Sequence, residues 1–165
     1  MSARFSQSHG IVPVEAPLAL NYNTGMTMDS VNMAKYGHGT LIIMGSADCA
    51  GAGILTMMAG ATDAAVTAAV TFTYRISSAD VDSATADVYS APATSAALTF
   101  VEASIVSGVY VIEWDVEDMN VSGVQYDYMT PVLSAAGTAG IISAVIILSE
   151  PRYEKDIMST AIPTA

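Results

Sequence analysis

The stretch that decides the fold runs from Gly108 to Leu148, and it opens with Gly-Val-Tyr-Val-Ile-Glu-Trp-Asp-Val over residues 108–116. Apolar and acidic side chains alternate here: Tyr110, Ile112, Trp114 and Val116 share one parity, while Glu113 and Asp115 take the other. Successive side chains of a strand point to opposite faces of its sheet. The order therefore predicts a strand with one apolar face and one acidic face.

The same stretch closes on Gly-Ile-Ile-Ser-Ala-Val-Ile-Ile-Leu over residues 140–148, which is apolar at nearly every position. Such a run is typical of a strand that is buried on both sides, in the middle of a sandwich or at a subunit interface. We expect Ile141–Leu148 to join the 109–116 strand in the core sheet. A neighbouring subunit is expected to cover one of its faces.

Shorter runs with strand composition occur along the rest of the chain, at Thr40–Met44, Ile54–Met58, Val66–Ile76, Leu98–Ala103 and Val124–Thr130. Turn-forming residues separate them, and roughly eight or nine short strands at regular spacing favour a sandwich or a jelly roll. The predicted fold is all-β, a jelly-roll-like β-sandwich with extended N- and C-terminal arms. Pro131 is expected to place the end of the 124–130 strand at an edge or a bulge.

The two ends of the chain are predicted to be arms around a central domain of residues 28–150. In residues 1–27, Pro13 and Pro17 exclude a helix interior and a central strand, so this segment is expected to be extended. Its apolar anchors should lie along its own domain or along a neighbour. A second extended arm, residues 151–165, is expected to leave the core at Pro151.

The composition indicates a surface that other subunits cover. Of the 165 residues, 52% are hydrophobic and only 13% are charged, against about 25% charged in an ordinary soluble protein. Obligate interfaces resemble a domain core cut in half, and an obligate oligomer would have this bias.

The charge balance excludes two classes of partner. The net charge is −11, and the chain has only five lysines and arginines. Nucleic-acid binding needs a dense basic patch, and adsorption to an anionic membrane needs basic residues as well. The first ten residues lack the apolar region of a signal peptide, and the longest apolar stretch is far below the roughly 20 residues of a membrane span. We expect synthesis in a cytoplasm.

Nucleophilic catalysis has one candidate pair, Cys49 and His38, eleven residues apart. Without a third group to orient the histidine, the interpretation of Cys49 as a small neutral residue at a loop edge is preferred. A paired-carboxylate site could be formed by the acids Glu113, Asp115, Glu117 and Asp118. Calcium could bind to the same acids, or to Asp80 and Asp82. A solvated acidic face gives the same pattern, and the spacing of a calcium loop is missing. No catalytic residue is predicted.

Metal and cofactor sites are not predicted either. One cysteine and two histidines, His9 and His38, are too few for a structural zinc site. Gly51 and Gly53 lack the lysine and the helix start of a phosphate-binding loop. Among the ten methionines, Met44, Met57 and Met58 are expected in the core, while Met26 and Met28 are equally suited to an interface.

Three segments together resemble a family of known proteins. They are Met-Asp-Ser-Val-Asn-Met-Ala-Lys-Tyr-Gly-His-Gly-Thr-Leu-Ile-Ile (28–43), Gly-Val-Tyr-Val-Ile-Glu-Trp-Asp-Val-Glu-Asp-Met (108–119) and Ser-Ala-Val-Ile-Ile-Leu-Ser-Glu-Pro-Arg-Tyr (143–153). In this order they resemble small structural proteins of tailed bacteriophages, including head cement or decoration proteins with a jelly-roll-like fold.

The resemblance implies a homotrimer on the outer capsid surface that locks major capsid subunits together, with no catalytic residue, cofactor or metal. The residues expected at the oligomer or capsid interface are Phe5, Val12, Val14, Leu18, Met26, Met28, Ile141, Ile142, Arg152 and Tyr153. Two alternatives stay open. One is a tail structural component, and the other is a receptor- or glycan-binding module that uses Tyr89, Tyr126 and Tyr128.

Overall fold

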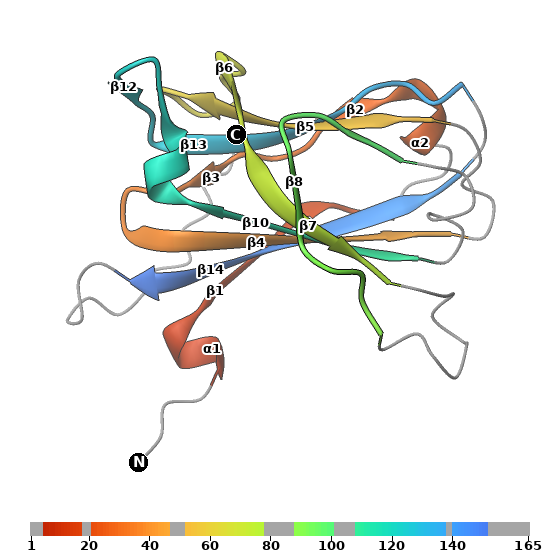
Figure 1. Ribbon diagram of the computed structural model, residues 1–165, viewed down its shortest axis with the longest axis horizontal. Coiled ribbons are helices and arrows are strands. Elements are labelled where there is room, and N and C mark those ends of the chain that lie inside the picture. The colour runs from red at the N-terminus through yellow and green to blue at the C-terminus, as the bar shows by residue number, and fades with distance from the viewer. Residues whose placement is uncertain are drawn as a thin grey trace.

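A computed structural model describes residues 5–17, 21–46, 52–77, 88–100, 108–137 and 140–151, and Figure 1 shows two β-sheets stacked on each other. The helical elements are single turns: α1 (Phe5–Ser8), α2 (Asn21–Thr24) and the 3-10 turn η1 (Val116–Met119). The strands are β1 (Gly10–Glu15), β2 (Met26–Thr27), β3 (Val31–Asn32), β4 (Tyr36–Gly45), β5 (Ile54–Gly60), β6 (Ala68–Val70), β7 (Phe72–Ile76), β8 (Ala93–Ser95), β9 (Leu98–Thr99), β10 (Val109–Asp115), β11 (Asn120–Val121), β12 (Val124–Gln125), β13 (Tyr128–Leu133) and β14 (Ile142–Pro151).

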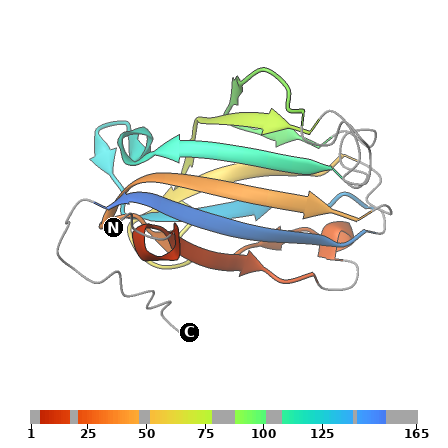
Figure 2. The same cartoon turned by 90° about the horizontal axis from the view of Figure 1, so that it is seen from below.

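The large sheet has the strand order β1-β14-β4-β10-β7-β8, and all its pairings are antiparallel. Its strands lie side by side in the view of Figure 2. The second sheet has the order β2-β13-β5-β6, with β3 added beside β13 and β9 beside β5. The all-β sandwich is therefore confirmed, and the jelly-roll connectivity stays a prediction. More strands form than the eight or nine expected, because many of them are only two or three residues long.

The predicted alternation in β10 is confirmed. Tyr110, Ile112 and Trp114 are buried between the sheets, whereas Glu113 and Asp115 lie on the outer side. Tyr110 packs against Phe100 with ring centroids 4.6 Å apart. The apolar parity of this strand thus forms the centre of the hydrophobic core, which is the main source of stability in a sandwich of this size.

Strand β14 alternates in burial although its sequence does not alternate in polarity. Ile142, Ala144, Ile146 and Leu148 are buried, and the residues between them are only partly buried. The strand lies between β1 and β4, so its inner side faces the core and its outer side faces away from the second sheet. The described residues therefore bury one face of β14 and leave the other partly exposed.

The predicted strand Val66–Ile76 divides into two strands in different sheets. Residues Ala68–Val70 pair with β5 in the smaller sheet, and residues Phe72–Ile76 pair with β10 in the large sheet. The chain bends between them at the exposed Thr71, and Figure 1 shows it descending from one layer to the other. A strand that switches sheets in this way closes a corner of a sandwich.

Pro131 lies inside β13, so the prediction that it marks a sheet edge or a bulge was wrong. On one side, β13 pairs with β5 throughout its length. On the other side, β3 pairs with residues 128–129 and β2 with residues 132–133, which leaves Pro131 at the break between them. Proline lacks a backbone N–H, and at this break no ladder partner requires one. Its carbonyl still accepts a hydrogen bond from Met28 N at 2.9 Å.

Gly39 makes room for the only tryptophan of the chain. It lies opposite Trp114 in the β4–β10 pairing, on the inner side of the sheet. A Cβ atom on Gly39 would lie 2.3 Å from Trp114 Cζ2 and 2.5 Å from Cε2. The indole ring therefore lies directly over the glycine, and any side chain at position 39 would collide with it.

Part of the predicted N-terminal arm belongs to the sandwich. Residues Gly10–Glu15 are the edge strand β1, paired with β14, so this segment lies along its own domain, one of the two expected arrangements. The sheet begins at Gly10, ahead of the expected boundary at residue 28. Pro13 is tolerated because an edge strand has one free side. Residues 1–4, 18–20 and the predicted C-terminal arm from 152 onward lie outside the described residues.

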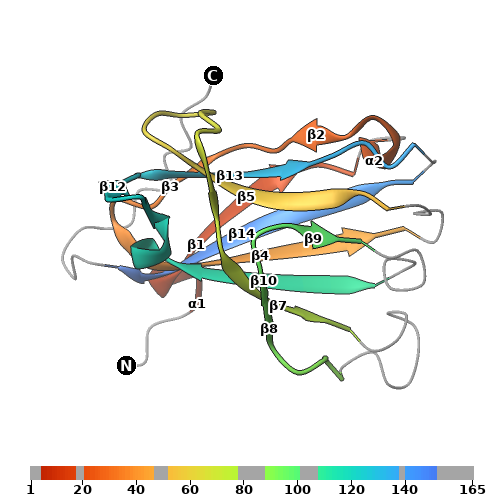
Figure 3. The ribbon, with the colours of Figure 1, turned by 45° about the horizontal axis from the view of Figure 1, so that its top comes forward.

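The two ends of the sandwich differ. Figure 3 shows η1 and the β11–β12 hairpin at one end and α2 at the other. The buried Tyr22 of α2 accepts a hydrogen bond from Gly53 N at its hydroxyl, at 3.1 Å. Among the described residues, no helix is long and apolar enough to cross a membrane.

Candidate functional site

The outer side of the large sheet carries a row of apolar residues across four neighbouring strands. The registers align Pro13 with Val145, Val145 with Ile42, and Ile42 with Val111. On the next strand the row ends at Arg75, which pairs with Val111. These positions alternate with the core positions, so all of them point away from the second sheet.

Adjacent rows extend this apolar surface. Ile11 pairs with Ile147 in the row on one side, and Met44 pairs with Val109 in the row on the other. Met44 is 50% exposed and Ile11 is 43% exposed, so the expectation that Met44 lies in the core was wrong. We call this surface the outer face; its apolar residues are Ile11, Pro13, Ile42, Met44, Val109, Val111, Val145 and Ile147.

The outer face differs from the usual exposed face of an antiparallel sheet, which is polar. Strands β1, β14, β4 and β10 contribute its apolar side chains, with Thr40 and Ser143 between them, and the charged residues lie toward its margin on β10 and β7. Large contiguous apolar patches on a protein surface mark sites of interaction. Part of the excess of apolar residues in the composition thus lies on one surface of the domain.

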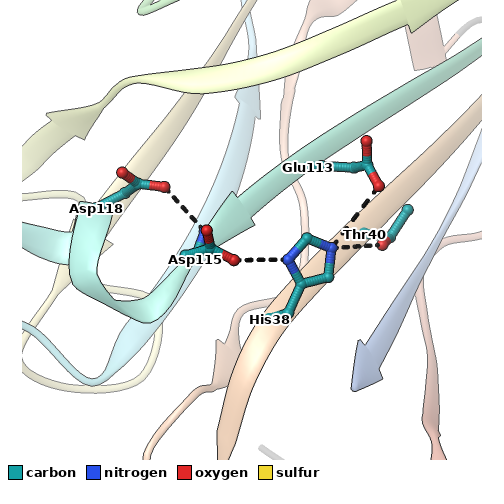
Figure 4. Close-up of polar contacts among 5 residues, drawn as sticks. All are labelled: His38, Thr40, Glu113, Asp115 and Asp118. Carbon is teal, nitrogen blue, oxygen red and sulfur yellow. Dashed lines mark hydrogen bonds and ion pairs between the residues drawn. The ribbon is translucent and has the colours of Figure 1, made fainter. Parts of the chain in front are cut away.

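A polar cluster occupies one margin of the outer face, where β4 and β10 approach η1 (Figure 4). His38 Nδ1 lies 2.7 Å from Asp115 Oδ1, and His38 Nε2 lies 3.7 Å from Glu113 Oε1. The Thr40 hydroxyl lies 3.3 Å from the same Nε2. The register opposes His38 to Asp115 and Thr40 to Glu113, so the sheet itself brings these four side chains together.

The contacts define a role for each nitrogen of the His38 ring. A proton on Nδ1 is donated to Asp115, and Nε2 then accepts a hydrogen bond from the Thr40 hydroxyl. When both nitrogens are protonated, Nε2 faces the carboxylate of Glu113. The imidazole is thus held between two acids, with Asp115 as the closer partner.

The order hydroxyl, imidazole, carboxylate is also that of a hydrolytic triad, but the surroundings of Thr40 differ. Thr40 is in the middle of β4, which pairs with both β10 and β14, so its backbone is engaged in the ladders. Acyl transfer also needs hydrogen-bond donors aimed at the developing oxyanion. In the described part of the chain, the hydrogen-bond partner of the Thr40 hydroxyl is His38 Nε2. The cluster is better explained as a polar margin of the outer face.

The two carboxylates of the cluster contact opposite nitrogens of one ring, so they do not converge on a common point. No group of three or more metal-ligating side chains that could hold a metal ion occurs among the described residues. Asp118 has a different role: its Oδ2 accepts a hydrogen bond from Asp115 N at 2.9 Å at the start of η1. The acidic run is therefore divided between the sheet margin and the turn.

At the start of β4, burial raises the pKa of the Tyr36 hydroxyl above its usual value of 10.0.

The unequal distances in the cluster give a testable prediction. Combining His38→Gln with Asp115→Asn in a double-mutant cycle is expected to give a coupling of about 0.5–1 kcal/mol, because a hydrogen-bonded, partly exposed pair is removed. The cycle of His38→Gln with Glu113→Gln should give a coupling near zero, since 3.7 Å exceeds a hydrogen bond. Urea denaturation measures both. Equal couplings would show that Glu113 is as close a partner of His38 as Asp115.

The predicted interface residues fall into three groups. Phe5 and Ile141 are exposed at the surface, 53% and 36% respectively. Val12 and Met26 are half-buried against the core. For Val14, Met28 and Ile142 the prediction has to be corrected, because their side chains are buried in the core of their own domain. Leu18, Arg152 and Tyr153 lie outside the described residues.

Other candidates from the sequence are dispersed. His9 stacks on Phe5, with ring centroids 4.1 Å apart, in the segment that precedes β1. Of the tyrosines considered for glycan binding, Tyr89 is exposed, whereas Tyr126 and Tyr128 are half-buried. Cys49, Asp80 and Asp82 lie outside the described residues. The sequence did not reveal the pairing of His38 with Asp115, since it depends on the β4–β10 register.

Comparisons with protein-family models, with curated proteins and with solved structures found no match to this chain.

Proposed function

We propose that this protein is a structural component of a tailed-bacteriophage particle. In this role it binds the outer surface of the capsid as a homo-oligomer, a homotrimer by the resemblance, and stabilises the shell. It acts through interaction surfaces and not through catalysis. Its partners are the major capsid protein and further copies of itself. It is made in the cytoplasm of the host bacterium and resides on the virion.

The observation that carries this proposal is the apolar outer face of the large sheet. The described residues leave this apolar surface partly exposed, and association with another protein would bury it. The three segments that resemble phage proteins also support the proposal. They contribute β4, β10 and β14, which are adjacent strands in the middle of the large sheet.

Such a protein would stabilise a shell because many identical copies bind to the same particle. Each copy that bridges two capsid subunits removes apolar surface from water, which contributes about 25 cal/mol per Å². Many copies bound simultaneously to one particle add these contributions, and a subunit can then leave only after several contacts break. A modest patch on each copy is therefore sufficient to raise the temperature at which the shell opens.

The N-terminal turn is the element that we propose to contact the shell. Helix α1 precedes the edge strand β1, and its Phe5 is 53% exposed. This turn lies on the outer side of the large sheet, at the ends of β1 and β14, and not inside the sandwich (Figures 1 and 2). It can therefore reach a second protein while the sheets stay intact.

The test uses empty shells assembled from the major capsid protein that is encoded in the same phage genome. The full-length chain is expected to co-sediment with these shells to saturation and to raise their disassembly temperature. Phe5→Ser should weaken binding about tenfold, the effect of losing roughly 1.4 kcal/mol. Val124→Ser is the matched control, because Val124 is similarly exposed at the hairpin between β11 and β12.

Two results would count against the proposal. Failure of the wild-type chain to bind shells at any concentration would remove the capsid as the partner. Equal binding by the Phe5→Ser and Val124→Ser variants would show that α1 is not the contact.

A further inference from the structure

We infer that the outer face packs against the same face of a neighbouring copy of this chain. The inference rests on the proposed homo-oligomer and assigns one of its subunit contacts to a surface. A two-fold axis lying in the plane of the face would bring it against its own copy, so this contact joins copies in pairs and is separate from the three-fold contact of the trimer that the resemblance implies. The residues that carry the argument are Ile42, Val111, Val145, Arg75 and Glu113.

Shape and chemistry of the face suit a second sheet. Ile42, Val111 and Val145 stand in one row on adjacent strands. The rows on both sides are mixed: Ile147 is followed by Thr40 and Glu113 in one, and Ser143 is followed by Met44 and Val109 in the other. Two sheets pack with their side chains interdigitated at about 10 Å separation, as the two sheets of this sandwich already do. The outer face can repeat that packing with a copy of itself.

The charges on the face are complementary to each other. Arg75 ends the row of Val111 and is exposed, and no ion pair involves it among the described residues. Glu113 lies in the next row, and its recorded contact is His38 Nε2 at 3.7 Å. Within one copy these two side chains are diagonal neighbours. Between two copies, Arg75 of one can pair with Glu113 of the other, and the reciprocal pair forms by symmetry.

The area reaches the size of a small specific contact. The five strands from β1 to β7 in sheet order, at about 4.8 Å spacing, and the three rows, at about 6.7 Å spacing, cover roughly 480 Å² per copy. Two such faces together would bury about 1,000 Å², the size that a specific interface has to reach.

Other occupants suit the face less well. An anionic lipid surface or a nucleic acid would be repelled by Glu113, Asp115 and the net charge of −11. A second copy has the same net charge, but the centre of the outer face is uncharged and its margin offers both signs. The face is thus a surface on which two acidic molecules can meet with little repulsion.

The experiment measures the native mass of the full-length chain by light scattering over a dilution series. Wild type is expected to be oligomeric at micromolar concentration. The double variant Ile42→Thr/Val145→Thr keeps β-branched residues and should raise the dissociation constant at least tenfold. Val66→Thr is the control, because Val66 is exposed outside the outer face. Thermal melts show whether each variant is folded.

Charge reversal provides a second readout that leaves the apolar rows unchanged. Arg75→Glu is expected to weaken assembly, whereas Lys35→Glu, an equal change at an exposed position in the turn before β4, should not. Adding Glu113→Arg to Arg75→Glu should restore assembly, since the pair is exchanged between copies.

A monomeric wild type at all concentrations would overturn the inference, and so would an unchanged mass in the folded Ile42→Thr/Val145→Thr variant. Shell binding is measured separately, so the two ideas can fail separately. A chain that binds shells as a monomer contradicts this inference and the proposed oligomeric state but leaves the capsid as the partner, whereas an oligomer that ignores shells contradicts the proposed capsid role.

Discussion

Replacing Gly39 by alanine is expected to lower the free energy of unfolding by about 3 kcal/mol, which should lower the Tm by roughly 6–12 °C. The added methyl group would lie 2.3 Å from Trp114 Cζ2 and 2.8 Å from Cη2. An indole ring buried between two sheets cannot move aside without opening the core. Thermal and urea denaturation of the purified variant measure the effect.

The same strand offers a control and a rescue. Gly37→Ala introduces a methyl group whose nearest neighbours belong to Glu150, an exposed residue, at 3.1 Å, and it should cost less than about 1 kcal/mol. In a Trp114→Leu background, Gly39→Ala should cost much less than in wild type, because the colliding ring is gone. Equal costs for Gly39→Ala and Gly37→Ala would show that Trp114 does not lie over Gly39.

Replacing Ile146 by alanine is expected to destabilise the fold by about 3–4 kcal/mol, because a fully buried side chain is truncated and leaves a cavity. The neighbouring Ile147→Ala should cost only about 1 kcal/mol, since Ile147 is partly exposed on the outer face. The two variants change the same residue type on consecutive positions of β14. Denaturation at low protein concentration compares them without a contribution from assembly.

The order of these two costs distinguishes the two faces of β14. At high concentration the effects should differ in kind: Ile147→Ala weakens association, and Ile146→Ala weakens the fold of each copy. If both substitutions cost the same at low concentration, β14 would be buried on both sides within one chain, and the outer face would not be available to a partner.

The sequence was sufficient to identify the buried side of a strand where apolar and polar residues alternate along it. In β10 the alternation of Tyr110, Ile112 and Trp114 with Glu113 identified the buried side correctly. In β14 both parities are apolar, so the sequence located the strand but not its inner face. The outer face was visible only as an excess of apolar residues. Its location required the registers that align Val145, Ile42 and Val111 from three distant segments.

The remaining differences have the same physical origin. His38 and Asp115 are 77 positions apart, and only the β4–β10 pairing brings them within hydrogen-bonding distance. Met44 has the composition of a core residue, but its parity in β4 places it outside. Pro131 is tolerated inside β13 because the adjacent edge is divided between two short strands. Pairing between distant segments decides the positions of His38, Asp115 and Pro131. In β4 both parities are apolar, so the sequence alone does not tell which of them faces the core.

The most direct test of the proposed role is the copy number of this protein in intact phage particles. Quantitative gel densitometry or mass spectrometry would compare it with the major capsid protein of the same particles. A shell-stabilising oligomer predicts a fixed ratio, either one copy per capsid subunit or one copy per three. Absence from purified particles, or presence in only a few copies per particle, would contradict a role on the capsid surface.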